Sequence, residues 1–167
     1  MRILKFAAAA IVLAPLCAGC AGSVSAPVAL QAMPAEQKAA LRIADISTDA
    51  DSSLKASEGE FGFIAQKVRA YIDAEKPGTI VAGAPGALHM KIHFTTFDRG
   101  DAFARGMLIG MGQIRIAATV SLVDASGATA AVYQVSKDFA LGGVIGATTT
   151  VDDVENGFAK SVAEVVK

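Results

Sequence analysis

Three stretches of the chain alternate hydrophobic and polar residues, as a strand does when one face of its sheet is buried. They are residues 88–94, 113–124 and 131–139. Residues 124–127, Asp-Ala-Ser-Gly, have the chemistry of a turn, so the last two stretches are expected to form a hairpin. A shorter apolar run at residues 41–46 predicts one more strand ahead of them.

Two other stretches repeat their apolar residues at the three- and four-residue spacing of a helix that buries one side. Ser57 precedes the first and Thr150 the second, and each is followed three residues later by an acid, which is the spacing of a capping box. Pro77 and Gly78 end the first helix. The expected buried residues are Phe61, Ile64, Val68, Tyr71 and Ile72 in the first helix and Val151, Val154, Phe158, Val162, Val165 and Val166 in the second.

The order strand, helix, three strands, helix predicts a single α+β domain over residues 39–167, with a mainly antiparallel sheet and its helices on one face. If the first helix joins two parallel neighbouring strands, the three longest connections meet at one end of the sheet. These are residues 47–56, 98–112 and 142–149. Loops on a rigid scaffold are where binding usually takes place, so we expect the binding site at this end. We expect the chain to enter the domain at the opposite end.

Residues 1–19 have the composition of an export signal. Arg2 and Lys5 give a positive start, residues 6–13 form an apolar run, and Pro15 and small residues precede Cys20. The apolar run is shorter than the ~20 residues needed to span a bilayer. An ordinary secretory signal with incidental cysteines is one interpretation of this stretch.

The residues Ala18-Gly19-Cys20 resemble the lipobox of bacterial lipoproteins. The resemblance implies cleavage before Cys20 and acylation of its thiol, so that the lipid bilayer becomes a partner of the chain. Ala21 after the cysteine implies, by the same resemblance, sorting to the outer membrane of a Gram-negative cell, with the domain on the periplasmic face.

Residues 20–38 are expected to form the lipidated cysteine and a flexible tether, because they contain Gly, Ser and Pro without periodicity. Eighteen residues of such a chain span roughly 20–25 Å on average. The alternative is an amino-terminal strand or helix that packs on the domain.

The cysteine count and the net charge exclude further classes of function. The chain has two cysteines, one in the signal and one at the lipidation position, which leaves neither a disulfide nor thiol chemistry. The whole chain has a formal net charge of −1, which is too mild to indicate a nucleic-acid partner.

The connections 98–112 and 142–149 share a four-residue glycine spacing, in Gly106 with Gly110 and in Gly142 with Gly146. One interpretation is a surface for an unknown envelope protein or for self-association. The other is that these glycines serve turns and bulges while Met107, Leu108 and Ile109 enter the core. The candidate partner-binding residues are Arg99, Phe103, Arg105, Gly106, Met107, Leu108, Gly110, Gly142, Gly143 and Gly146.

A lipid-inserting segment is disfavoured at this place in the sequence. Two aspartates, Asp98 and Asp101, and two arginines, Arg99 and Arg105, crowd its apolar residues. A charged side chain in the apolar layer of a bilayer is costly.

The pattern Asp98-Arg99-Gly100, Arg105-Gly106, Gly110 and Gly112, followed by Leu122-Val123-Asp124 and a Gly-Gly pair, resembles a family of Gram-negative lipoproteins catalogued as a domain of unknown function. The resemblance covers roughly residues 38–167 and implies location and fold rather than activity. The order of elements is also similar, more loosely, to periplasmic domains of the Tol translocation protein and of lipoprotein activators of cell-wall synthases, which bind proteins.

The sequence gives little support for an enzyme active site or a cofactor site. His89 and His93 lie on a predicted strand, where they stand about 13 Å apart, too far to share a metal. The glycines at 142–146 lack the Lys-Ser/Thr of a phosphate loop, and Asp152 and Asp153 would repel an anion there. We therefore expect no enzyme, no cofactor and no metal site.

The sequence thus predicts a membrane-anchored lipoprotein that binds a protein, or itself, through its glycine-rich end. The alternative is a lipoprotein that binds a small molecule or glycan with the same loops. A protein-binding site requires an exposed apolar patch, and a ligand site requires a concave pocket with convergent polar groups.

Overall fold

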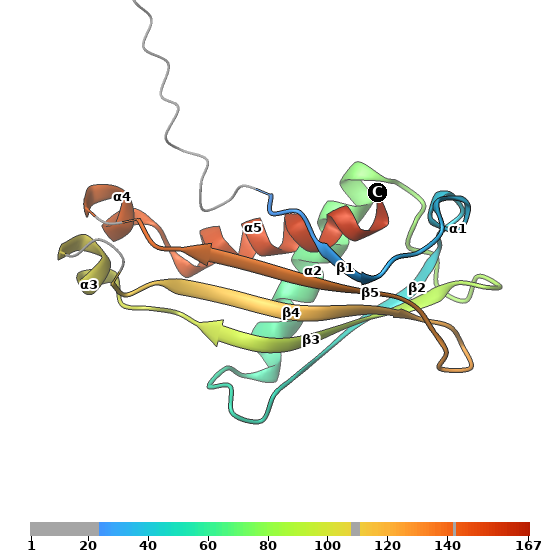
Figure 1. Ribbon diagram of the computed structural model, residues 1–167, viewed down its shortest axis with the longest axis horizontal. Helices are drawn as coiled ribbons and strands as arrows, with labels where there is room; N and C mark the ends of the chain where they lie inside the picture. Colours follow the sequence, from blue (N-terminus) through green and yellow to red (C-terminus); the bar gives the residue numbers. More distant parts are fainter. Residues whose placement is uncertain (1–23, 108–110, 142) are drawn as a thin grey trace, which may run out of the picture.

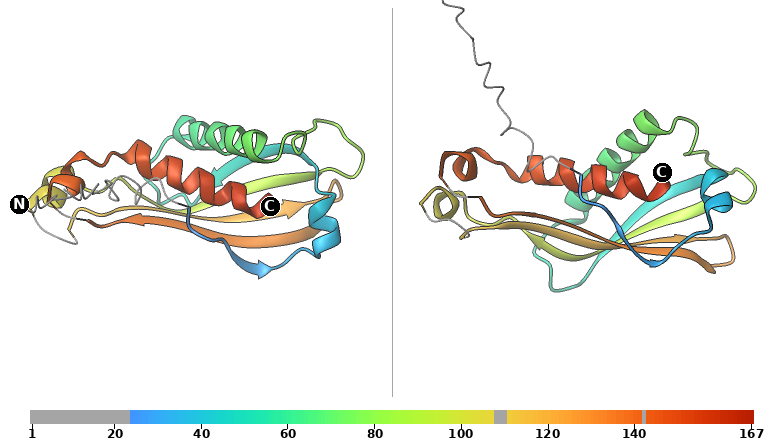
Figure 2. Two further views of the ribbon diagram at one scale, coloured as in Figure 1. Left: turned by 90° about the horizontal axis from the view of Figure 1, so that it is seen from above. Right: turned by 45° about the horizontal axis from the view of Figure 1, so that its top comes forward.

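The computed structural model describes residues 24–107, 111–141 and 143–167. These residues form one five-stranded sheet in the order β1-β5-β4-β3-β2, with two long helices packed across one face (Figures 1 and 2). The predicted α+β fold, with a mainly antiparallel sheet, is confirmed. The strands are β1 Val28–Gln31, β2 Ile43–Ala50, β3 Leu88–Asp98, β4 Ile114–Val123 and β5 Thr129–Phe139. The helices are α1 Ala35–Ala39, α2 Glu58–Glu75, α3 Ala102–Met107, α4 Gly143–Thr148 and α5 Val151–Ala163, followed by a 3-10 turn, Glu164–Val166.

The core lies between the sheet and the long helices α2 and α5. Alternate residues of β3 and β4 are buried, as their hydrophobic pattern predicts. The ring of Phe61 on α2 stacks on Phe94 of β3 with centroids 4.4 Å apart, and Phe158 of α5 lies 5.7 Å from Phe94. Three aromatic side chains from three elements therefore hold the two layers together.

Both predicted helix starts are confirmed. The Ser57 hydroxyl accepts a hydrogen bond from the Glu60 N–H, 3.3 Å away. At α5, Asp153 N–H donates to the Thr150 hydroxyl (3.2 Å) and Thr150 N–H donates to the Asp153 carboxylate (2.9 Å). This reciprocal capping box fixes the residue at which α5 begins.

The strand directions follow the expected crossover. Strand β2 runs parallel to β3, and the pairs β3–β4 and β4–β5 are antiparallel. The connections after β2, β3 and β5 therefore leave the same end of the sheet. Two of them contain α3 and α4, which lie side by side (Figure 1).

The expectation of a flexible tether is wrong for the part of it that the structure describes. Strand β1 pairs with β5, α1 follows it, and Met33 is buried in the core. The Ser25 N–H donates to the Ser161 hydroxyl of α5 at 2.7 Å. The alternative of a packed amino-terminal strand is correct, because the free edge of β5 supplies backbone partners for β1.

The point of entry also differs from the prediction. Val28 lies opposite Gln134, near the middle of β5, and the chain reaches the far end of the sheet only at α1. The expected signal at residues 1–19 and the lipidation position Cys20 lie outside the described residues and stay predictions.

Candidate functional site

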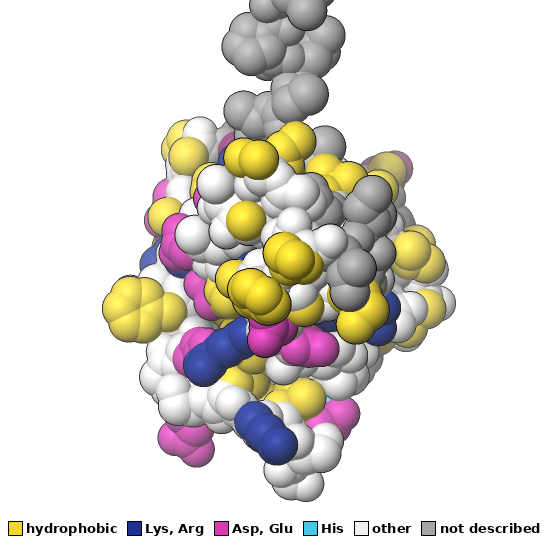
Figure 3. Space-filling model, turned by 90° about the vertical axis from the view of Figure 1, so that its left-hand side faces the viewer, with side chains coloured by type: hydrophobic (Ala, Val, Ile, Leu, Met, Phe, Trp, Pro, Cys, Tyr) yellow, Lys and Arg dark blue, Asp and Glu magenta, His cyan; other side chains and the backbone are white. Residues whose placement is uncertain are grey.

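Helices α3 and α4 carry a group of exposed apolar side chains at one end of the molecule (Figure 3). Phe103 is 77% exposed, Met107 68% and Val144 81%. We call the set of six, Phe103, Met107, Met111, Leu141, Val144 and Ile145, the tip surface. It holds six of the eleven large hydrophobic side chains that are exposed among the residues described. Clusters of this kind mark interaction sites more often than isolated apolar residues do.

Arg105 holds the two tip helices together from inside. Its side chain is buried, although its residue type is usually exposed. The guanidinium donates to the carbonyl oxygens of Gly146 (3.1 Å), Gly112 (2.8 Å) and Thr149 (3.1 Å). Gly146 and Thr149 lie at the carboxyl-terminal end of α4, where carbonyl groups lack partners within the helix and attract a cation. Arg105 is therefore a structural residue, and its buried side chain is not available to a partner in the free domain.

The glycine spacing serves the contact between α3 and α4 within one chain. A Cβ on Gly106 would lie 3.3 Å from the Cβ of Ala147 in α4, and one on Gly146 would lie 2.9 Å from the carbonyl oxygen of Arg105 in α3. The missing side chains of Gly106 and Gly146 therefore let two segments of the same chain approach, and their contact with a partner stays a prediction. Gly143 begins α4 with open space around it, and Gly110 and Gly142 lie outside the described residues.

Each of the four charges near the apolar residues has a partner within the chain. Arg105 is buried, and Arg99 forms an ion pair with Glu60 of α2. The carboxylates of Asp98 and Asp101 accept hydrogen bonds at 2.8 Å from backbone N–H groups two and three residues further along. The charges that border the tip surface are therefore already paired within the chain.

The alternative in which Met107 enters the core is wrong, because Met107 is exposed. Leu108 lies outside the described residues. The sequence analysis missed Met111, Leu141, Val144 and Ile145. The sequence indicated only that these residues are apolar and lie in connections between elements. No helix or strand periodicity there predicted whether they are buried.

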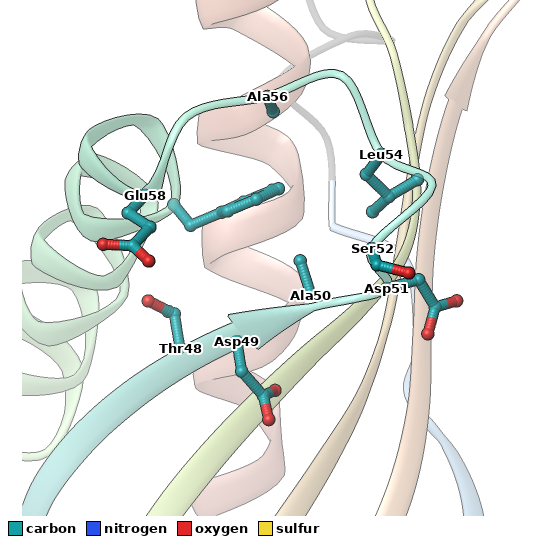
Figure 4. Close-up of a pocket in the computed structure, with 9 residues that line it drawn as sticks. Thr48, Asp49, Ala50, Asp51, Ser52, Leu54, Ala56 and Glu58 are labelled. Atoms are coloured by element: carbon teal, nitrogen blue, oxygen red, sulfur yellow. The ribbon is translucent and has the colours of Figure 1, made fainter.

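A second feature is a hollow of about 610 Å³ where β2 leads into α2 (Figure 4). Thr48, Ala50 and Leu54 point into it, whereas the carboxylates of Asp49 and Asp51 point away. The hollow thus lies in one of the predicted loops, but it gathers few polar groups that could orient a ligand.

The carboxylates of Asp49 and Asp51 are bound to His93 of β3. Asp49 lies 2.9 Å from Nδ1 of His93, and Asp51 lies 3.0 Å from Nε2. The hydrogen bond to Asp49, with a further one to Asp51, raises the pKa of His93 above its ordinary value. His89 lies 3.0 Å from Asp45, so the two histidines have separate partners.

Within the described part of the chain, no helix is both long and apolar enough to cross a membrane. None of the curated proteins compared with the sequence matches it.

The fold is similar to that of PelC from Paraburkholderia phytofirmans, solved as a dodecamer of a leucine-to-methionine variant. The TM-score is 0.53 at 11% identity, over 84% of this chain and 96% of that one. A second PelC dodecamer from the same organism gives a TM-score of 0.49 at 11% identity, over 75% and 88% of the two chains. A Caulobacter crescentus CB15 protein described as a "putative lipoprotein" gives 0.32 at 20% identity, over 71% and 81%. At this identity the first likeness shows a shared fold and nothing more.

A family model matches part of the sequence, and it includes α3 but only the first residue of α4. The match runs from residue 63 in α2, through both hairpin strands and α3, to residue 143 at the start of α4. Over residues 63–143 the chain is similar to the domain of unknown function DUF4410, which supports the expected likeness to a family without an assigned activity.

Proposed function

We propose that the chain is a lipid-anchored lipoprotein of the outer membrane whose periplasmic domain binds another protein, or further copies of itself, through the tip surface. The observation that carries the proposal is the tip surface itself. Six apolar side chains face solvent on and beside two helices that Arg105 and two close glycine contacts hold in place. A preformed apolar surface of this kind loses little conformational entropy when a partner covers it.

Two further observations support parts of the proposal. The lipobox-like Ala18-Gly19-Cys20 supports the anchor. PelC, which has a similar fold, forms a dodecamer, and this supports further copies of the chain as one class of partner.

Binding of a small molecule or glycan has weaker support. The hollow beside β2 is large enough for a small ligand, but two of its three carboxylates, Asp49 and Asp51, are taken up by His93. Thr48, Ser52 and Glu58 remain as polar groups at its wall.

The test is photo-crosslinking in cells that carry the full chain with its native signal. A photoreactive residue replaces Phe103, and captured molecules are identified by mass spectrometry. We expect a discrete protein adduct, which Val144→Asp reduces at least tenfold because a carboxylate in the interface loses its water. Val144 is 81% exposed, so the same change leaves the free domain folded.

The matched control is Phe63→Asp, which places the same charge on an exposed residue of α2 outside the tip surface. It should leave the adduct unchanged. An adduct between two copies would identify self-association. A folded, membrane-located protein that gives no adduct, or gives only lipid adducts, would contradict protein binding at the tip.

A further inference from the structure

The first described residues of the chain present an apolar stripe to solvent. Val24, Ala26, Val28 and Leu30 are all exposed, and Val28 and Leu30 are 60% and 63% exposed. We call these four residues the N-terminal stripe. A strand at the edge of a sheet normally shows polar or charged residues to water. This edge shows the reverse.

The segment that contains the stripe carries no charge. Between Cys20 and Glu36 the sequence has no Asp, Glu, Lys, Arg or His. Charged side chains are the usual protection of an exposed edge strand against association. An uncharged apolar edge is suited to a surface that is itself apolar and needs no charge complementarity.

The length of chain before the stripe limits what can cover it. Only three residues lie between Cys20 and Val24, and the four residue steps from one to the other span at most about 14 Å in an extended chain. The Ser25 N–H, bonded at 2.7 Å to the fully buried Ser161, fixes the segment to α5. A lipid on Cys20 would therefore hold the N-terminal stripe beside the bilayer, because there is no long tether to separate them.

We infer that the N-terminal stripe lies in the bilayer interface and orients the domain on the membrane. The inference rests on the lipid anchor of the proposed function, and it concerns a surface other than the tip. The stripe contacts the boundary between lipid headgroups and acyl chains. This layer accepts uncharged apolar side chains next to a lipid anchor. Since the segment has no basic residue, binding does not require anionic lipid.

The test uses the full-length lipidated protein in vesicles of phosphatidylethanolamine with a minor share of phosphatidylglycerol. Val28→Cys and Leu30→Cys each carry an environment-sensitive fluorophore. Acylation of Cys20 and loss of Cys17 with the signal leave the introduced cysteine as the only free thiol. Ser53→Cys is the matched control, an exposed position after β2 at the opposite edge of the sheet.

We expect lipids with a spin label near the headgroup to quench the probes at 28 and 30 at least threefold more than the probe at 53. The difference should persist when phosphatidylglycerol is omitted. Equal quenching at the three positions, in protein whose mass shows acylated Cys20, would overturn the inference and leave the anchored function intact. Unmodified Cys20 would overturn both.

A second copy of the chain is the other candidate occupant, because β1 is an edge strand. Crosslinks between position 28 of two copies, without quenching by lipid, would show pairing of edge strands and overturn the inference.

Discussion

The two pairs of helices in this domain are built in opposite ways. Helices α2 and α5 are long, and they bury their apolar stripes against the sheet. Helices α3 and α4 have six residues each, and they expose their apolar side chains while burying an arginine. The first pair uses its hydrophobic residues for folding, whereas the second leaves them available for binding. The comparison indicates that polar contacts hold the tip together, whereas buried apolar residues hold the core together. Each half of this contrast can be tested.

The largest effect is expected in the core. Phe158→Ala removes a fully buried ring that packs near Phe94. The free energy of unfolding should fall by about 3–5 kcal/mol, because transfer free energy is lost and a cavity remains. Urea denaturation followed by far-UV circular dichroism measures this loss. A fall below about 1 kcal/mol would mean that α5 is not part of the cooperative core.

Arg105→Met should loosen the tip while the core stays folded. The change removes the four hydrogen bonds that the guanidinium donates, and it takes the charged donor away from the carbonyl groups of Gly146 and Thr149. We expect a local cost of about 3 kcal/mol, seen as roughly 100-fold faster hydrogen exchange in α3 and α4.

The matched control for this variant is Arg115→Met, at an exposed position of β4. It should leave exchange in α3 and α4 unchanged. Uniformly faster exchange across the sheet in Arg105→Met would show that the tip and the core unfold as one cooperative unit. The contrast between the two helix pairs would then be wrong.

The sequence predicted the part of the molecule that folds by burying hydrophobic residues. Alternation predicted β3, β4 and β5, and apolar residues at three- and four-residue spacing predicted α2 and α5. The spacing from Ser57 and from Thr150 to the following acids predicted both helix starts. The parallel crossover then placed three connections at one end.

What the sequence did not predict depends on contacts without a side-chain signal. The acceptors of Arg105 are backbone carbonyls, so nothing in the residue pattern indicated its burial. Strand β1 is recognisable only through its pairing with β5, about a hundred residues away. The glycine spacing correctly indicated close approach, but between two segments of one chain instead of between two chains.

A polar contact also links the two long helices, and it should give a smaller effect. Lys67 of α2 donates to Asp152 (2.5 Å) and to the mostly buried Glu155 (2.6 Å) of α5. Burial opposes the charge of Lys67, but these two bonds outweigh it and raise its pKa. Lys67→Met should cost about 1–2 kcal/mol at pH 7, and Lys55→Met, in an exposed loop, should cost little.

This contact should weaken in acid. The hydrogen bond from Lys67 lowers the pKa of Asp152, so its contribution is present above the ordinary pKa of about 3.9 and is lost as the pH falls through the lowered value. The stability difference between wild type and Lys67→Met should therefore shrink at pH 2 to 3. A difference that stays constant between pH 7 and pH 2 would mean that packing of the lysine stem, not its charge, links the helices.

A still smaller effect is expected on the open face of the sheet, at His93. Its raised pKa means that the stability gained from Asp49 and Asp51 is complete below about pH 6.5 and is lost as the pH rises through the folded-state value. His93→Gln should therefore lower the thermal midpoint more at pH 6 than at pH 8. The group is exposed, so the difference should be a few tenths of a kcal/mol.

The smallest effect on folding is expected where the effect on binding is largest. Phe103→Ser removes a ring that is 77% exposed, in contrast to the fully buried Phe158. An exposed side chain away from caps and pairs usually changes stability by less than about 0.5 kcal/mol. Urea denaturation should therefore give the wild-type midpoint, while crosslinking from a photoreactive residue at position 107 falls. A loss of stability close to that of Phe158→Ala would show that the tip surface packs against the chain itself, and the distinction between folding residues and binding residues would fail at this helix pair.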